Sequence, residues 1–124
     1  MDSQRYRAED LIQFGKNVLT KIGFPEKQAH AAAKILVEAD LRGDHAHGIA
    51  GGMSLDDILD RVFDDQGNPQ IKRTQIADFT ADKQKYPTIL SFDAHGTLGH
   101  YVALEIIPQL IQTANKFGYA KAYI

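Results

Sequence analysis

The chain has 124 residues, 44% of them apolar and 24% charged, so it suits a compact domain with a modest core and not a disordered protein. Its formal net charge of −2 gives no field for nucleic acid or an anionic membrane surface, and the lack of cysteine excludes disulfides and thiolate metal sites. No apolar run nears the roughly twenty residues of a membrane span, and the N-terminus lacks the apolar core of a signal peptide, so we expect a cytoplasmic protein.

Two helices are predicted at the N-terminus. Apolar positions recur at helical spacing over residues 7–22, and Gly23 supplies a stop. Pro25 and Glu26 suit the first turn of a second helix, which we expect to run to Arg42. Its buried face should consist of Ala29, Ala32, Leu36 and Ala39. Because the connection is so short, the two helices should pack as an antiparallel pair.

The next segment, LRGDHAHGIAGG over residues 41–52, holds four glycines and two histidines and is typical of a loop. A short helix should follow it in MSLDDILDRVFDD, with Ser54 as the N-cap. The turn-forming stretch DDQGNP then interrupts the chain. We therefore place a boundary here, between an N-terminal helical region, 1–69, and the beginning of a sheet-containing domain, 70–124.

The C-terminal half predicts strands around one long helix. The segments IKRTQIADFTA and Thr88–Phe92 have the texture of strands, possible partners in a hairpin, and YAKAYI at the end resembles another strand. The intervening helix contains Pro108, which predicts a kink or a later start, and Gly118 should end it. Its buried stripe should be Ala103, Ile107, Leu110, Ile111 and Ala114. The fold class expected is α+β, with N-terminal helices followed by the start of a mainly antiparallel sheet.

The histidines are the chemical candidates, because imidazole exchanges protons near neutral pH. If residues 45–47 are extended, His45 and His47 point to the same side, as a metal site needs; otherwise only one can face a pocket. Asp93, His95 and His100 could add ligands, although no spacing requires it. Solvated histidines in a glycine turn are the plainer alternative. Neither a Rossmann fingerprint nor a phosphate loop occurs in the sequence.

The stretch EADLRGDHAHGIA, residues 38–50, resembles the E-A-D-L-R-G-x-D-S-H-G-x-A motif of the type 2 malate/L-lactate dehydrogenases. DAHGTLGH, residues 93–100, is similar to a D-x-x-x-G-L-G-Q turn of that family. The resemblance implies a non-Rossmann oxidoreductase that uses NAD or NADP and interconverts a small 2-hydroxy acid and a 2-keto acid. It also implies a homodimer, and it places the proton donor or acceptor at His47.

Three positions depart from the family motif. His45 stands where the family has aspartate, Ala46 replaces its serine, and Gly51 replaces an arginine suited to clamp a substrate carboxylate. The resemblance also implies that the dinucleotide sites lie after Ile124. We therefore expect an N-terminal portion of the fold that binds no dinucleotide and is inactive by itself, with no metal site and no assigned substrate-binding residue.

Two other hypotheses remain open from the sequence. The first is a non-catalytic interaction or assembly module on the same scaffold, which the replacements at Ala46 and Gly51 favour. The second is a metal-binding module built on the histidines.

Overall fold

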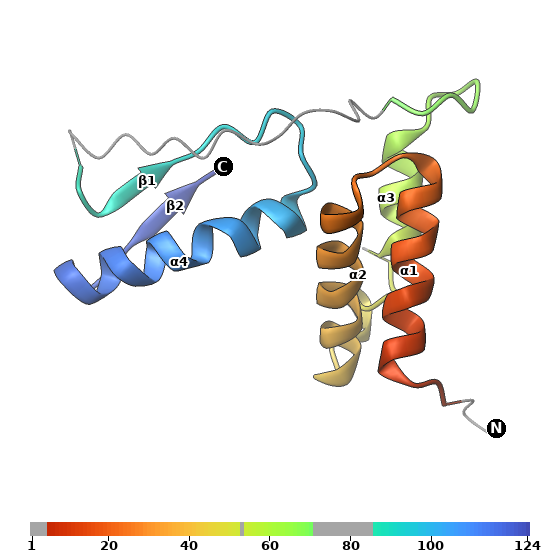
Figure 1. Cartoon of the computed structure of the whole chain (residues 1–124), viewed down its shortest axis with the longest axis horizontal. Coiled ribbons are helices and arrows are strands. Elements are labelled where there is room, and N and C mark those ends of the chain that lie inside the picture. The colour runs from red at the N-terminus through yellow and green to blue at the C-terminus, as the bar shows by residue number, and fades with distance from the viewer. Residues whose placement is uncertain (1–4, 53, 71–85) are drawn as a thin grey trace. The chain divides into compact units, whose positions relative to one another are not determined.

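The computed structural model describes residues 5–52, 54–70 and 86–124 and forms two compact units, Met1–Arg73 and Thr74–Ile124. The first unit contains helices α1 (Ala8–Ile22), α2 (Glu26–Leu41) and α3 (Leu55–Val62) and the 3₁₀ helix η1 (His45–His47). The second contains β1 (Ile89–Ser91), α4 (Gly99–Phe117) and β2 (Lys121–Tyr123) (Figure 1). The division into domains 1–69 and 70–124 stays a prediction, because neither unit is shown to fold alone. Among the described helices, none combines the length and apolar character needed to cross a membrane.

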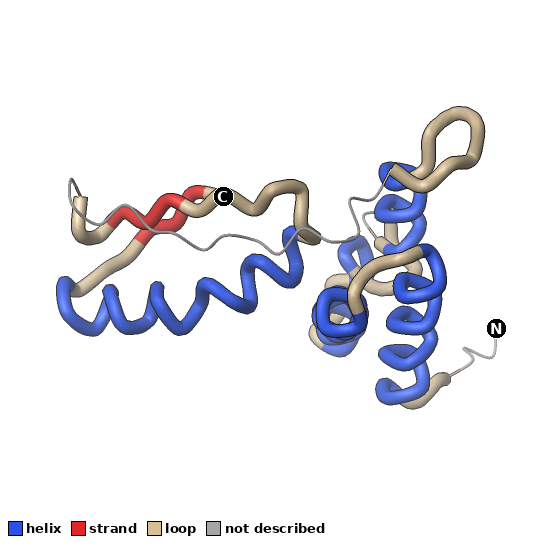
Figure 2. The backbone as a smooth tube through the Cα atoms, turned by 45° about the horizontal axis from the view of Figure 1, so that its top comes forward, coloured by secondary structure: helices blue, strands red, loops and turns tan. Residues whose placement is uncertain are grey.

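Helices α1 and α2 form the predicted antiparallel pair and lie side by side in both views (Figures 1 and 2). Gly23 ends α1 in the left-handed region, at φ 117°, where a side chain would be strained. Gly15 is buried, and a Cβ atom there would lie 3.0 Å from the Cβ of Ala33. Small residues at the contact therefore let the two backbones approach closely. Of the predicted face of α2, three residues are buried and Ala39 is half-buried.

The N-cap predicted for α3 is confirmed. Ser54 is fully buried, and its hydroxyl oxygen accepts the backbone N–H of Asp56 at 3.4 Å. The turn after α3 is organised by Asp64, whose carboxylate accepts the backbone N–H of Asn68 at 2.8 Å and of Gln66 at 3.0 Å. The breaker stretch thus forms a turn held by its own side chains.

The expectation of a mainly antiparallel sheet is wrong for the described strands. β1 and β2 pair in parallel, with Leu90 opposite Ala122, and α4 connects them. Parallel strands need a crossover of a dozen or more residues, which a 19-residue helix provides. The segment IKRTQIADFTA, residues 71–81, lies entirely outside the described residues, so the hairpin that it was expected to form is not tested.

The buried face of α4 also differs from the prediction. Tyr101, Val102 and Ile106 are buried, while Ile107 and Ile111 of the predicted stripe are 42% and 56% exposed. The small core of this unit consists of Leu90, Phe92, Val102 and Ile106, and the partly buried Ala122 of β2 packs against it. Apolar residues surround α4 on several sides, so periodicity alone could not select the inner face. The helix begins at Gly99 and continues through Pro108, so the later start considered for Pro108 does not occur. It ends at Gly118, φ 88°, as predicted.

Candidate active site

The histidine segment begins where α2 ends. Gly43 adopts φ 82°, its N–H donates to the carbonyl of Asp40, and the N–H of Asp44 donates to the carbonyl of Ala39, both at 3.0 Å. This pair of bonds is a Schellman motif, in which a glycine reverses the chain and satisfies carbonyls of the last turn. The reversal directs residues 44–49 back alongside the end of the helix.

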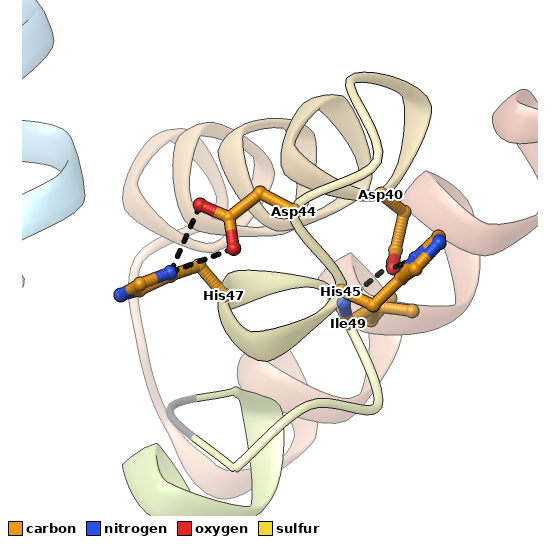
Figure 3. A network of polar contacts seen from close by, with 5 residues as sticks. All are labelled: Asp40, Asp44, His45, His47 and Ile49. Carbon is orange, nitrogen blue, oxygen red and sulfur yellow. Dashed lines mark hydrogen bonds and ion pairs between the residues drawn. The ribbon is translucent and has the colours of Figure 1, made fainter.

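Asp40 holds that returning segment in place. Its Oδ2 accepts the backbone N–H of Ile49 at 2.8 Å, and its Oδ1 lies 3.1 Å from Nδ1 of His45 (Figure 3). Gly48 is buried against the same carboxylate, where an added Cβ would overlap the oxygens. A glycine is required at residue 48 for steric reasons, since its own φ of −76° suits any residue.

Asp44 contacts His47. Both carboxylate oxygens lie 3.0 Å from Nδ1 of the imidazole, and the second ring nitrogen lies on the side of the ring away from Asp44 (Figure 3). The hydrogen bond from His47 lowers the pKa of Asp44 below its ordinary value. An ionised carboxylate only accepts hydrogen bonds, so Nδ1 of His47 carries the proton and Nε2 is left for another group.

The two imidazoles of η1 do not share a side. Residues 45–47 form a 3₁₀ turn instead of an extended strand, and Figure 3 shows His45 and His47 pointing in opposite directions. The condition for a paired metal site is therefore not met. Across residues 5–52, 54–70 and 86–124, no three His, Asp or Glu side chains gather to hold a metal ion.

The other candidate ligands lie in the second unit. The carboxylate of Asp93 accepts the backbone N–H of His95 at 2.8 Å and lies 3.4 Å from its imidazole Nδ1, in the turn before α4. His100 lies in the first turn of α4, where burial lowers its pKa. Within the described part of the chain, these three residues do not belong to any cluster of three or more potential metal ligands.

Gly51 is enclosed by backbone. A Cβ atom at this position would overlap the carbonyl oxygens of His45 and Ala46, which belong to η1. By contrast, a Cβ at Gly52 would meet nothing within 4 Å. The 3₁₀ turn thus excludes any side chain at residue 51 unless the backbone moves.

Comparison with known proteins identifies the family. The model of the malate/L-lactate dehydrogenase family matches residues 6–124, nearly the whole chain. The chain belongs to this family. A malate dehydrogenase from Pyrococcus abyssi (strain GE5 / Orsay) is 44% identical over 45 residues. Those residues are 36% of this chain and 12% of the relative, so the aligned part is a small fraction of that protein's length.

Membership confirms the resemblance first seen in residues 38–50 and gives the site its context as part of a dehydrogenase family. From the sequence, no role was assigned to Asp40, which matches an aspartate of the motif, or to Asp44, which stands at the unspecified position of the motif. The signal for Asp44 was its spacing from His47, three residues within one turn, which brings two side chains together. For Asp40 no comparable local signal exists, because its bond to Ile49 spans nine residues.

Proposed function

We propose that this protein is part of an NAD- or NADP-dependent oxidoreductase that interconverts a small 2-hydroxy acid and the corresponding 2-keto acid, with His47 as the proton donor and acceptor. The observation that carries the proposal is the pairing of Asp44 with Nδ1 of His47, which leaves Nε2 for a substrate oxygen. Family membership supports the reaction type.

The imidazole suits both directions of this reaction. Reducing a ketone adds a hydride to carbon and a proton to oxygen, and an imidazolium with Nε2–H can donate that proton. In the reverse direction, neutral imidazole with a free Nε2 accepts the hydroxyl proton as the hydride leaves carbon. His47 is 54% exposed at its side chain, so a small substrate can reach it.

A nicotinamide dinucleotide would supply or accept the hydride. A loop that contains glycine and leads into a helix N-terminus is the usual kind of pyrophosphate-binding site. Among the described segments, the connection from β1 to α4 has this form. It contains no lysine or arginine, and the Asp93 carboxylate accepts the N–H of His95, so an anion would meet negative charge there. This connection therefore does not fit a pyrophosphate cradle, and we assign none of the described residues to the cofactor.

A non-catalytic interaction or assembly module is the second candidate function. The enclosed position of Gly51 favours it, because this turn cannot hold the arginine that the family motif uses at that point. In that case His47 and Asp44 would be surface residues that bind no substrate.

Enzyme assays on the protein expressed from its complete reading frame separate the two candidates. We expect a fall in 340 nm absorbance when NADH or NADPH is supplied with one of a panel of small 2-keto acids. A protein that is folded by circular dichroism and oxidises neither nucleotide with any keto acid would favour the non-catalytic module.

We also propose that the protein forms a homodimer, as membership of this family suggests. The uncovered apolar side chains of α4, Leu104, Ile107 and Ile111, support self-association. Light scattering coupled to size-exclusion chromatography measures the mass directly, and a monomer at micromolar concentration would contradict this proposal.

A further inference from the structure

We propose that Asp44 is a positioning residue for His47, which fixes the imidazole in the Nδ1–H tautomer and directs Nε2 toward the substrate. The inference rests on the proposed role of His47 for its functional consequence. Its structural part, the tautomer, can be tested independently of any activity.

The two Asp–His pairs of this turn differ in their other contacts. Asp40 divides its carboxylate between the imidazole of His45 and the backbone N–H of Ile49. The carboxylate of Asp44 has both of its oxygens within 3.0 Å of one atom, Nδ1 of His47. Asp40 therefore stabilises the fold of the turn, whereas Asp44 is directed at the ring of His47.

Local geometry makes the Asp44–His47 contact easy to form. Asp44 is the residue before η1 and His47 is its last residue, and the N–H of His47 donates to the carbonyl of Asp44 at 3.2 Å. The backbone thus already brings the two residues within one turn. Few rotatable bonds remain to be ordered when the side chains meet, because both side chains are short.

We expect the Asp44–His47 contact to orient the imidazole and to add little to the free energy of unfolding. The Asp44 and His47 side chains are 56% and 54% exposed, and exposed ion pairs contribute little to the free energy of unfolding. A histidine that transfers protons, however, must present one nitrogen in the correct tautomer, and a carboxylate on the other nitrogen selects it.

Nuclear magnetic resonance of the ¹⁵N-histidine-labelled chain tests the tautomer. Spectra are recorded at mildly alkaline pH, where histidine side chains are neutral, and the His47 signals are assigned with His47→Gln. We expect His47 to be predominantly the Nδ1–H tautomer in the natural sequence and to gain the Nε2–H form in Asp44→Asn. The control His45→Gln should leave the His47 signals unchanged. Equal tautomer populations in the natural chain and Asp44→Asn would overturn the proposal.

The kinetic arm uses the protein from the complete reading frame. We expect Asp44→Asn to lower kcat about tenfold or more while KM changes little, and Asp44→Glu to recover part of the loss. If kcat falls together with that of His47→Gln, both proposals stand. If His47→Gln retains full activity while the tautomer shifts in Asp44→Asn, the proposed function fails and the positioning geometry remains. An unchanged kcat in Asp44→Asn, with His47→Gln inactive, would overturn the positioning role in catalysis.

Discussion

The carboxylate of Asp40 accepts the backbone N–H of Ile49 at 2.8 Å, and this bond joins the last turn of α2 to the residues that follow His47. This bond closes the loop that contains η1. The position of the proposed catalytic imidazole of His47 therefore depends on Asp40, which lies in the preceding helix. The family motif thus encodes a folded turn as well as a chemical group.

Replacing Asp40 with alanine should destabilise the first unit. The variant loses a hydrogen bond between a charged group and a backbone N–H, and it leaves the half-buried N–H of Ile49 without its acceptor. We expect a loss of about 1–3 kcal/mol in the free energy of unfolding, measured by urea denaturation followed by circular dichroism. Asp40→Asn keeps one oxygen acceptor and should lose less. Equal stability of Asp40→Ala and the natural chain would show that the bond does not hold the loop.

Adding one methyl group at Gly48 should also destabilise the chain. In Gly48→Ala the new Cβ overlaps the Asp40 carboxylate, so the carboxylate must move away from Ile49. We expect a loss of about 1–3 kcal/mol in the free energy of unfolding. The matched control is Gly52→Ala, whose Cβ meets nothing within 4 Å. A control as unstable as Gly48→Ala would indicate a general intolerance of side chains in this loop.

Introducing the family's arginine at residue 51 should destabilise the chain, because the backbone leaves no room for a side chain there. The first side-chain atom of Gly51→Arg would overlap the carbonyl oxygens of His45 and Ala46, so the 3₁₀ turn must open to accommodate it. We expect a lower melting temperature than that of the Gly52→Arg control in differential scanning calorimetry. An unchanged melting temperature in Gly51→Arg would mean that the turn rearranges without cost.

The stability of the chain should fall as the pH drops below about 6.5, in part because of His100. Burial lowers its pKa in the folded state, so the unfolded chain binds a proton at a higher pH than the folded chain does. The contribution of His100 to stability is therefore present above the unfolded pKa and is lost as pH falls. We measure the urea midpoint of unfolding from about pH 8 down to about pH 5. As the pH is lowered, this midpoint should fall less steeply in His100→Gln than in the natural chain. A slope identical to that of the natural chain would exclude this source of pH dependence.

Local signals in the sequence predicted the helices well because they act within one turn. Gly23 and Gly118 end α1 and α4 in left-handed conformations, and Ser54 caps α3. The pairing of β1 with β2 depends on residues about thirty positions apart, and the expectation of antiparallel strands was wrong. The 19-residue helix between the strands was the available signal, since such a crossover favours parallel pairing.

In the candidate site, too, the sequence predicted a local feature but not the contacts between residues farther apart. The resemblance of residues 38–50 to a family motif led to His47, and its role stays a prediction. The contacts that hold it, from Asp44 within the turn and from Asp40 across it, follow from the reversal at Gly43 and the 3₁₀ geometry of η1. Whether two imidazoles separated by one residue share a side depends on that geometry, which the composition of the loop does not determine.

The proposed role of His47 is tested most directly by comparing His47→Gln with His45→Gln in the protein expressed from its complete reading frame. The two histidines lie in the same turn, and each contacts one aspartate, but only His47 is assigned to proton transfer. With NADH or NADPH and the best 2-keto acid of the panel, His47→Gln should lower kcat about 100-fold or more, and His45→Gln should change it less than about threefold. Full turnover in a folded His47→Gln variant would contradict the assignment of His47 as the proton donor and acceptor.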